Sequence, residues 1–445
     1  MKSQHIAVVG GGIAGLLSSL LLLQKGYFVT LIESSESTGG LLGRSYQWED
    51  CLFDYGTHFL SSTGHDWADE ILYGKNFEKT QDWIQVPVLR SGSYFAGRLN
   101  SDSQSLDIRG LPTDIYQAIC TELLSREAIT VPVSSLNDWV VQCFGEQMNE
   151  HVYAPMMRKF YGVSSDVLEP SAHLLLGLSR IILGSDFITQ QIKKSPYFDN
   201  LISYQSREQG ASKLKVFYPR TGVSEWVANL LTECQSYTNF NLTLNDRVDS
   251  LDTLAEGFEL QLSTQDTAQV YAGLVWTAPL PLLGKLLGLP SEPMTGLTWR
   301  RGDLYHFVFD TPFLSDLYYV MCYQPDLHSY RITLYSNFNP GKAGYHCTVE
   351  VVRGFEEDTL PVELIEAELR EMGLVQGKLI HSQVSVLKTG FPVNSILFGE
   401  QTAALASLLE SHAPRLVLAG KNASRQFFMK DVINQVFDLL KDKEF

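Results

Sequence analysis

The chain has 445 residues, of which 44% are hydrophobic and 19% are charged, and its formal net charge is −16. This length exceeds that of one ordinary core, so we expect two or three domains. The composition is typical of a folded globular protein. The acidic balance argues against non-specific binding to nucleic acid or to an anionic membrane surface, so no nucleic-acid partner is expected.

Cysteine spacing and hydropathy argue against a metal-binding, a secreted and a membrane-spanning protein. The six cysteines form no C-x-x-C pair, so we expect no metal site and no dithiol redox site, only reduced thiols. The apolar run at 13–23 follows a single lysine and three glycines, and no A-x-A site follows it, which argues against a signal peptide. No stretch is long enough to span a bilayer. We therefore predict a cytoplasmic protein without an integral membrane segment, and its oligomeric state stays open.

The amino-terminal segment has the pattern of a βαβ unit. His5–Val9 is a short apolar run, as in a buried parallel strand. Ile13–Lys25 is helical, and Gly26 is suited to end it. Phe28–Ile32 follows as a second strand, which gives the crossover its required length.

A glycine-rich turn joins the first strand to the helix. Gly10, Gly12 and Gly15 form G-x-G-x-x-G, in which the first allows the tight turn, the second a close approach of a pyrophosphate, and the third helix–strand packing. The helix amino terminus offers free N–H groups to phosphates. Glu33 ends the second strand, where a carboxylate binds ribose hydroxyls. This context predicts a dinucleotide with a free 2′-hydroxyl, FAD or NAD rather than NADP.

The remaining chain alternates between two kinds of pattern. Residues 85–205 mix polar loops with helical stretches, and the polar segment 193–213 is expected to be a loop between lobes. Alternating aromatic and β-branched positions at 295–352 predict an antiparallel sheet. We expect helices at Thr113–Ser125, Leu136–Phe144, Leu174–Leu183, Ser224–Cys234, Pro361–Met372 and Lys430–Lys441, and strands at Lys215–Tyr218, Thr243–Asp249, Phe258–Leu262, Gly273–Ala278 and Arg415–Ala419.

A second group of motifs resembles a known superfamily. Gly39-Gly40 and then Phe53-Asp54-Tyr55-Gly56-Thr57-His58-Phe59 follow Glu33. This resembles the FAD-binding superfamily of flavin amine oxidases, protoporphyrinogen oxidase, phytoene desaturases and UDP-galactopyranose mutase. Two adjacent glycines allow close backbone approach to an extended cofactor. The superfamily usually has Arg or Asn after the second glycine, where this chain has Leu41, which leaves Arg44 with that role or none.

Later matches extend the resemblance and imply FAD as the cofactor. They lie at 217–222, at Val248 with 275–279, and at Gly420-Lys421 followed by Met429–Ile433. There a helix amino terminus points at the flavin, which stabilises negative charge on its reduced form. The implied contacts are Gly10, Gly12, Ile13, Ala14, Gly15, Glu33, Ser34, Gly40, Leu41, Leu42, Tyr55, Gly56, Thr57, His58, Val248, Ala278, Gly420, Lys421, Met429, Asp431 and Val432.

The resemblance leaves three functions open. An oxidoreductase would pass a hydride from a small-molecule substrate to FAD. Amine oxidases of the superfamily hold a lysine–water pair near a position matched here by 299–309, which contains no lysine. A mutase-like isomerase would use reduced FAD as a nucleophile to isomerise a sugar nucleotide. Lys421 and residues 427–433 resemble the mutase pattern more closely than the oxidase pattern. The candidate ligands for the diphosphate are Arg300, Arg301, Arg331 and Arg353. The third is a non-catalytic flavin-binding protein.

The expected catalytic residues and architecture follow from these hypotheses. His58, Arg301 and Tyr305 are the candidate catalytic residues, and Asp54 is expected near the flavin. The fold class is α/β, with a Rossmann-type FAD-binding lobe, discontinuous in sequence, and an inserted α+β substrate lobe. We assign 1–85, 205–285 and 385–445 to the first lobe, and 86–204 and 286–384 to the second.

Overall fold

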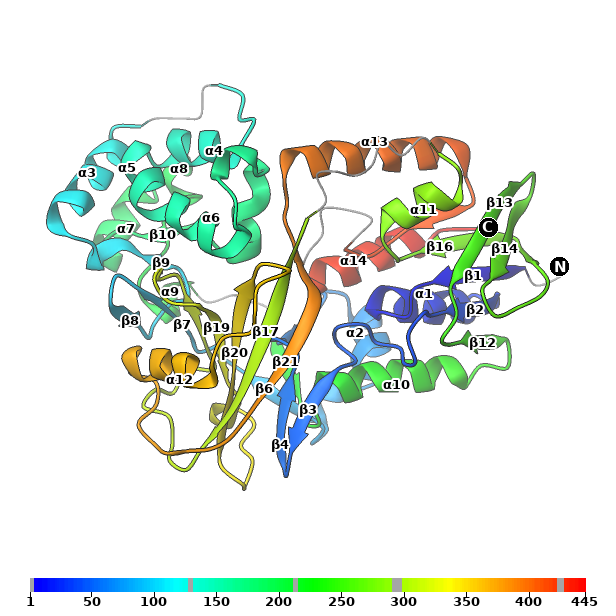
Figure 1. Cartoon of the computed structure of the whole chain (residues 1–445), viewed down its shortest axis with the longest axis horizontal. Helices are drawn as coiled ribbons and strands as arrows, with labels where there is room; N and C mark the ends of the chain where they lie inside the picture. Colours follow the sequence, from blue (N-terminus) through cyan, green and yellow to red (C-terminus); the bar gives the residue numbers. More distant parts are fainter. Residues whose placement is uncertain (1–3, 127–130, 211–214, 290–297, 422–427) are drawn as a thin grey trace.

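The computed structural model describes residues 4–126, 131–210, 215–289, 298–421 and 428–445. A parallel sheet with its helices lies at one end of the molecule, a large antiparallel sheet lies in the middle, and a cluster of short helices lies at the other end (Figure 1). The mixture of a Rossmann-type unit with a second α+β region agrees with the expected fold class.

The five-stranded parallel sheet carries the nucleotide-type topology. Its order is β12-β2-β1-β16-β22, and every neighbouring pair is parallel. The strands are buried apolar runs, as parallel strands covered on both faces should be. Their bounds are β1 His5–Val9, β2 Phe28–Ile32, β12 Phe240–Thr243, β16 Gly273–Trp276 and β22 Leu416–Leu418.

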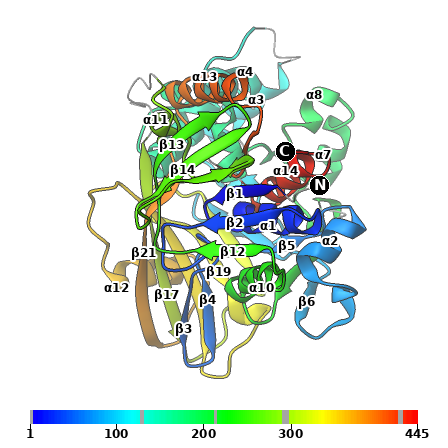
Figure 2. The ribbon, with the colours of Figure 1, turned by 90° about the vertical axis from the view of Figure 1, so that its right-hand side faces the viewer.

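Helices and a small sheet cover the two faces of this sheet. One face packs against α1 (Ile13–Gln24), α10 (Val223–Gln235) and α14 (Met429–Leu440) in one apolar cluster. The other face packs against β13 (Val248–Leu254), β14 (Gly257–Leu262), β15 (Gln269–Tyr271), α11 (Leu280–Leu286) and α13 (Ile396–His412). Figure 2 shows β13 and β14 above β1 and β2 and α10 below them.

The seven-stranded sheet has one apolar face and one face that carries polar side chains, and its central strands are buried. Its order is β21-β17-β20-β19-β18-β7-β8, antiparallel except for the parallel pair β18–β7. The apolar face packs against α12 (Val362–Glu371). The strands are β7 Ser91–Phe95, β8 Arg98–Asn100, β17 Trp299–Phe309, β18 Tyr319–Cys322, β19 Ser329–Leu334, β20 Tyr345–Arg353 and β21 Leu379–Pro392.

The remaining elements are a cluster of helices and several short strands. The helical cluster contains α3 (Thr113–Leu124), α4 (Leu136–Cys143), α5 (Glu146–Met148), α6 (Ala154–Tyr161), α7 (Asp186–Ile192), α8 (Pro196–Asp199) and α9 (Arg207–Gly210), with β9 (Leu106–Asp107) paired to β10 (Ile181–Ile182). Between the sheets lie hairpin β3–β4 (Ser45–Trp48, Cys51–Asp54), α2 (Asp66–Tyr73) and the small sheet of β5 (Leu60–Ser61), β11 (Val216–Pro219) and β6 (Trp83–Val86).

Several local predictions were wrong. The helix expected at Leu174–Leu183 is a 3-10 helix at Pro170–Leu176, which ends at Gly177 with φ +69°, and then β10. The strand expected at Thr243–Asp249 is divided between β12 and β13 by a turn that contains Asn245 at φ +55°. The expected loop at 193–213 contains α8 and α9, and its residues 211–213 lie outside the described part of the chain.

The proposed lobe boundaries stay a prediction, although all five parallel strands come from the three blocks assigned to the FAD-binding lobe. The boundary at 384/385 falls inside β21, which belongs to the antiparallel sheet. Within the described residues, no helix combines the length and the apolar character that a bilayer crossing requires.

Candidate active site

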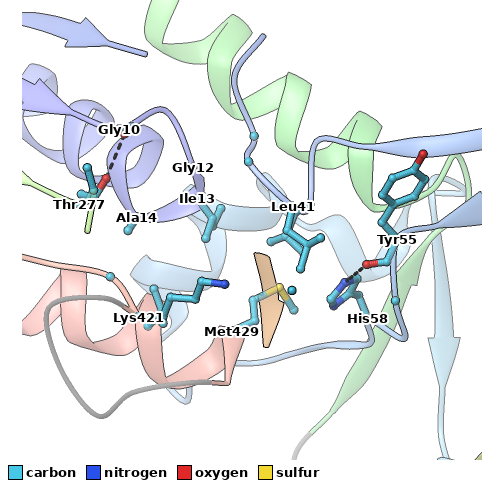
Figure 3. A pocket seen from close by; sticks show the side chains of 18 of the residues that line it. Gly10, Gly12, Ile13, Ala14, Leu41, Tyr55, His58, Thr277, Lys421 and Met429 are labelled. Carbon is cyan, nitrogen blue, oxygen red and sulfur yellow. Dashed lines mark hydrogen bonds between the residues drawn. The ribbon is translucent and has the colours of Figure 1, made fainter. Parts of the chain in front are cut away.

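A cavity of about 730 Å³ lies where the carboxyl ends of the parallel strands face the polar side of the antiparallel sheet. Open α/β sheets place their ligands at this edge. Figure 3 shows side chains from the amino-terminal turn, from segment 41–58 and from the carboxy-terminal segment around it. Three regions distant in sequence therefore line one space.

Of the three glycines of the turn, Gly12 leaves space for a ligand, whereas Gly10 and Gly15 are packed against neighbouring atoms. A Cβ added at Gly15 would lie 1.8 Å from the carbonyl oxygen of Gly10, so this glycine is needed for helix–strand contact. Gly10 has φ +102°, and Thr277 Oγ1 donates to its carbonyl at 3.1 Å. A Cβ at Gly12 would meet no atom within 4 Å, and Gly12 lines the cavity. The open side of Gly12 is thus the place where a pyrophosphate can approach.

The carboxylate of Glu33 binds backbone N–H groups at the sheet edge. Its Oε2 accepts from Gly11 N at 2.6 Å, and its Oε1 accepts from Ser35 N at 2.8 Å. These bonds fix the carboxylate at the cavity wall, beside the strand end of β2. Ser34 Oγ also donates to Oε1, at 3.3 Å, whereas Oε2 can accept a further hydrogen bond, so a ribose hydroxyl can still be bound.

The Gly39-Gly40 pair contacts the glycine turn that follows β1. Gly39 N donates to Gly11 O at 2.7 Å, and Gly39 and Gly40 have φ +98° and +57°. A Cβ at Gly40 would approach Gly12 Cα to 3.4 Å. The close stacking brings Leu41 and Leu42 to the cavity as an apolar wall, with Leu41 36% exposed.

The carboxy-terminal segment meets the helix amino terminus of α1. A Cβ at Gly420, which has φ +88°, would lie 3.3 Å from Ala14 Cβ. Lys421 extends into the cavity beside Met429 (Figure 3), and α14 begins at Met429. Within the described residues, the ammonium of Lys421 has no hydrogen-bond or ion-pair partner, and burial lowers its pKa. A partly buried cation without a partner fits an anionic ligand.

The segment Tyr55–His58 forms the opposite wall. Gly56 has φ +113°, and His58 Nε2 donates to Tyr55 O at 3.1 Å, which closes a tight turn. Burial lowers the pKa of His58 to about 4, and the nearby charge of Arg331 adds to this effect. The imidazole is therefore neutral at pH 7, with its Nδ1 free of a proton when Nε2 donates.

A buried ion pair from the antiparallel sheet completes this wall. Arg331 on β19 donates to Glu350 on β20 through Nε at 2.6 Å and Nη2 at 2.9 Å. Thr57 N also donates to Glu350, at 3.2 Å. The Glu350 side chain is 4% exposed and that of Arg331 is 23% exposed, and both line the cavity. Burial lowers the pKa of Arg331, but the charge of Glu350 outweighs this and raises it overall, so the guanidinium stays charged.

Acid is expected to destabilise the protein through its buried histidines. Burial lowers the pKa of His58, His173 and His346 to about 4 and that of His306 to about 3. Between pH 6.5 and 4 the unfolded state therefore binds more protons, so the free energy of unfolding falls as the pH falls. For a histidine as buried as His306, this effect lowers the free energy of unfolding by about 3 kcal/mol at pH 4.

Protonation of Asp54 has the opposite effect on the free energy of unfolding. Burial raises the pKa of Asp54 to about 6, so this group binds more protons in the folded state and stabilises it as the pH falls. This offsets part of the loss caused by the histidines. Urea unfolding at pH 7, 6, 5 and 4 measures the balance. A free energy of unfolding that is constant or rises on acidification would contradict this prediction.

Comparisons with known proteins agree with this geometry. A family model described as an NAD(P)-binding Rossmann-like domain matches residues 8–72. The 4,4'-diaponeurosporene oxygenase of Staphylococcus aureus (strain MRSA252) is 26% identical over 117 residues, which are 26% of this chain and 21% of that protein. The match thus spans about a fifth of the length of this curated relative.

Solved structures match almost the whole chain. Reduced UDP-galactopyranose mutase has a TM-score of 0.75 at 16% identity, with 99% of this chain and 95% of that chain covered. A protein of Exiguobacterium sp. 255-15, provisionally described as protoporphyrinogen oxidase, has a TM-score of 0.71 at 15% identity, with coverage of 99% and 98%. This chain therefore shares the fold of these solved structures. A fatty acid isomerase of P. acnes also matches, with a TM-score of 0.57, 14% identity and coverage of 99% of each chain.

The superfamily resemblance is therefore confirmed in the fold, and most of the residues it implied lie together. The cavity is lined by Gly10, Gly12, Ile13, Ala14, Glu33, Ser34, Gly40, Leu41, Leu42, Tyr55, Gly56, Thr57, His58, Val248, Ala278, Gly420, Lys421, Met429 and Val432. Gly15 and Asp431 do not line it; Gly15 packs on Gly10, and Asp431 lies in the first turn of α14.

Two of the three candidate catalytic residues lie outside this cavity. Arg301 forms an ion pair with buried Asp303 at 2.8 Å. Tyr305 is fully buried on the face of β17 that packs against α12, and its hydroxyl donates to Leu360 O at 2.9 Å. Side chains alternate between the two faces of a sheet, and a one-residue shift moves each of them to the opposite face. The register of the strand therefore decides which of its side chains face the cavity. Neither residue therefore belongs to the proposed site.

Two other residues named in the sequence-based hypotheses do not line the cavity. Asp54 does not line the cavity; it accepts from Tyr218 Oη at 2.7 Å and from Val223 N, at the start of α10, at 3.1 Å. Arg44 is exposed and does not line the cavity either. No sequence pattern marked Glu350 as a site residue, because its importance comes from its pairing with Arg331 on a neighbouring strand.

Proposed function

We propose that this protein is an FAD-dependent oxidoreductase that transfers a hydride from a small organic substrate to the flavin. One observation carries the proposal: the amino-terminal glycine turn lines the same cavity as Gly420, Lys421 and Met429, which lie more than four hundred positions away in the sequence. A nucleotide site would need only the first of these. The second adds a glycine and a helix amino terminus, which the resemblance assigns to the closing FAD element, and also a cation.

The residues of the cavity fit FAD in their chemistry. The open side of Gly12 and the first N–H groups of α1 would hold the pyrophosphate, because helix amino termini bind anions. Glu33 would accept from ribose hydroxyls. Lys421 would supply a positive charge to the anionic part of the cofactor. The donor set is therefore complementary to a dinucleotide with two phosphates.

The remaining wall would orient the substrate. When bound, FAD supplies the hydride acceptance itself. Leu41, Leu42 and Met429 give the cavity an apolar lining, which excludes water from the reacting groups. His58 is neutral, and through its bond to Tyr55 it holds the tight turn at the wall. These residues bind and position; the structure assigns none of them a proton transfer.

Absorption spectroscopy of the purified protein tests the proposal. We expect flavin absorption, or its appearance after reconstitution with FAD, and bleaching under anaerobic conditions by one member of a panel of amines, porphyrinogens, polyenes and lipophilic alcohols and ketones. Protein that stays colourless after incubation with FAD would refute flavin binding. A flavoprotein that no electron donor of the panel reduces would leave the oxidoreductase proposal without support and favour a non-catalytic role.

A mutase-like isomerase is the second candidate. It is favoured by the TM-score of 0.75 to reduced UDP-galactopyranose mutase and by the cation at Lys421. Such an enzyme would need prior reduction of FAD and would then convert its substrate without net electron transfer. Turnover of UDP-galactopyranose by the dithionite-reduced protein, with the flavin still reduced afterwards, would favour this candidate over the first.

Replacing His58 by alanine is expected to lower turnover at least tenfold while FAD is retained, since the imidazole forms the wall and not the phosphate site. Steady-state kinetics and the ratio of flavin to protein absorption measure the two effects. His173→Ala is the matched control, because His173 is a buried histidine stacked on Trp139 at 3.7 Å, outside the cavity. Equal losses of FAD and turnover in His58→Ala would refute a role in turnover.

We further propose a cytoplasmic location. The six cysteines are all free in the structure, and five of them are buried, which fits a reducing compartment. Fractionation of the native source would test this point.

A further inference from the structure

The part of the cavity formed by the antiparallel sheet and the helical cluster has a distinct chemistry. Leu175, Tyr330, Leu387 and Phe391 line it. The rings of Tyr330 and Phe391 meet edge to face with centroids 5.9 Å apart, and Tyr330 Oη donates to Leu175 O at 3.5 Å. We call these four side chains the apolar box. They offer large hydrophobic surfaces and hardly any free hydrogen-bonding groups.

One charged group, already neutralised, lies beside the apolar box. Arg331 follows Tyr330 in β19, and its guanidinium lies 5.6 Å from the Tyr330 ring centroid. Two of its five N–H donors are used by Glu350 in a bidentate pair. The other donors have no partner within the described residues, and the side chain lines the cavity. The pair as a whole has no net charge.

The other cations of the cavity belong to different segments. Lys421 and Lys430 flank the start of α14, and Arg247, at the start of β13, is paired with Asp249 at 2.9 Å. A nucleoside diphosphate bound against the apolar box would therefore find one guanidinium, whose charge is already matched by Glu350. Burying a further anion there would be costly, whereas a neutral acceptor could use the free N–H groups at little cost.

We propose that the substrate of this site is an uncharged, largely apolar molecule whose ring or chain packs in the apolar box and whose single neutral oxygen accepts a hydrogen bond from Arg331. This inference rests on the proposed flavin function and names its substrate class. It favours a lipophilic alcohol or ketone over a sugar nucleotide. Glu350 sets the specificity by cancelling the charge of Arg331.

Titration of the FAD-loaded protein with matched probes tests the inference. The probes are 2-naphthol, naphthalene, 2-naphthoate and UDP, and the readout is the perturbation of the flavin absorption spectrum. We expect 2-naphthol to bind about tenfold more tightly than naphthalene, because of the Arg331 hydrogen bond, and at least tenfold more tightly than 2-naphthoate. UDP should perturb the spectrum least. Tighter binding of 2-naphthoate or UDP than of 2-naphthol would overturn the inference.

The Glu350→Gln variant tests the charge argument directly. Glutamine keeps an acceptor oxygen for Thr57 N and Arg331, but the guanidinium charge is no longer cancelled. We expect 2-naphthoate to gain at least tenfold in affinity relative to 2-naphthol. An unchanged ratio would refute the role of Glu350. Asp107→Asn, which alters a largely buried pair with Arg109 outside the cavity, is the control and should leave the ratio unchanged.

A double variant, Arg331→Met with Glu350→Leu, covers the case in which the single variant does not fold, because it removes both charges together. It should retain FAD and bind 2-naphthol no better than naphthalene. A loss of FAD instead would show that Arg331 serves the flavin and would overturn the inference. Protein that takes up no FAD before any substitution would refute the proposed function itself, so the two failures are distinguishable.

Discussion

Replacing Gly12 by valine is expected to weaken FAD binding by more than about 100-fold while the apoprotein stays folded, because the side chain would fill the place of close pyrophosphate approach. The position tolerates a side chain by itself: its backbone is extended, with φ −70° and ψ −178°, and an added Cβ meets no atom within 4 Å. Fluorescence titration of the apoprotein with FAD measures the affinity, and circular dichroism measures its melting temperature.

Gly15→Ala is the informative comparison. Its Cβ would lie 1.8 Å from Gly10 O, so α1 must move away from β1. We expect a loss of stability of roughly 1–3 kcal/mol, visible as a lower melting temperature of the apoprotein. If Gly12→Val melted as early as Gly15→Ala, or bound FAD as the unmodified chain does, the open side of Gly12 would not be a ligand site.

Lys421→Glu is expected to weaken FAD binding by about 100-fold or more, because it places a carboxylate where the cavity now offers a cation to a phosphate-bearing ligand. The backbone at Gly420 packs against Ala14 in the first turn of α1, so the charge acts close to the helix amino terminus. Isothermal titration of the apoprotein with FAD measures the change, and the loss should be smaller at high salt.

Two control variants separate charge from packing. Lys421→Met should weaken FAD binding less than Lys421→Glu and should stabilise the apoprotein, since it removes a partly buried cation whose pKa is lowered by burial. Lys285→Glu changes the charge by the same amount at an exposed position on α11 and should leave FAD affinity within about twofold. Equal effects of Lys285→Glu and Lys421→Glu would show a long-range effect of net charge.

Local sequence determined the cofactor side of the molecule. The G-x-G-x-x-G turn, β1, α1 and β2 form within one segment, so periodicity and glycine spacing were sufficient to predict them. The closing strand β22 and helix α14 were also predicted, within one residue at each end. The helix α13, in contrast, was not predicted, because its apolar and polar residues do not separate into two faces and Gly399 interrupts the pattern.

The substrate side was decided by tertiary structure alone. Arg301 and Tyr305 lie in a strand that was correctly expected, but the register of β17 directs Tyr305 to α12, and Asp303 binds Arg301. Arg331 and Glu350 become a site only because β19 and β20 are neighbours and Thr57 approaches them from a distant segment. The sequence by itself determined the glycine turns, whose conformations are local; pairing between strands, which joins distant residues, decided which charged groups face the cavity.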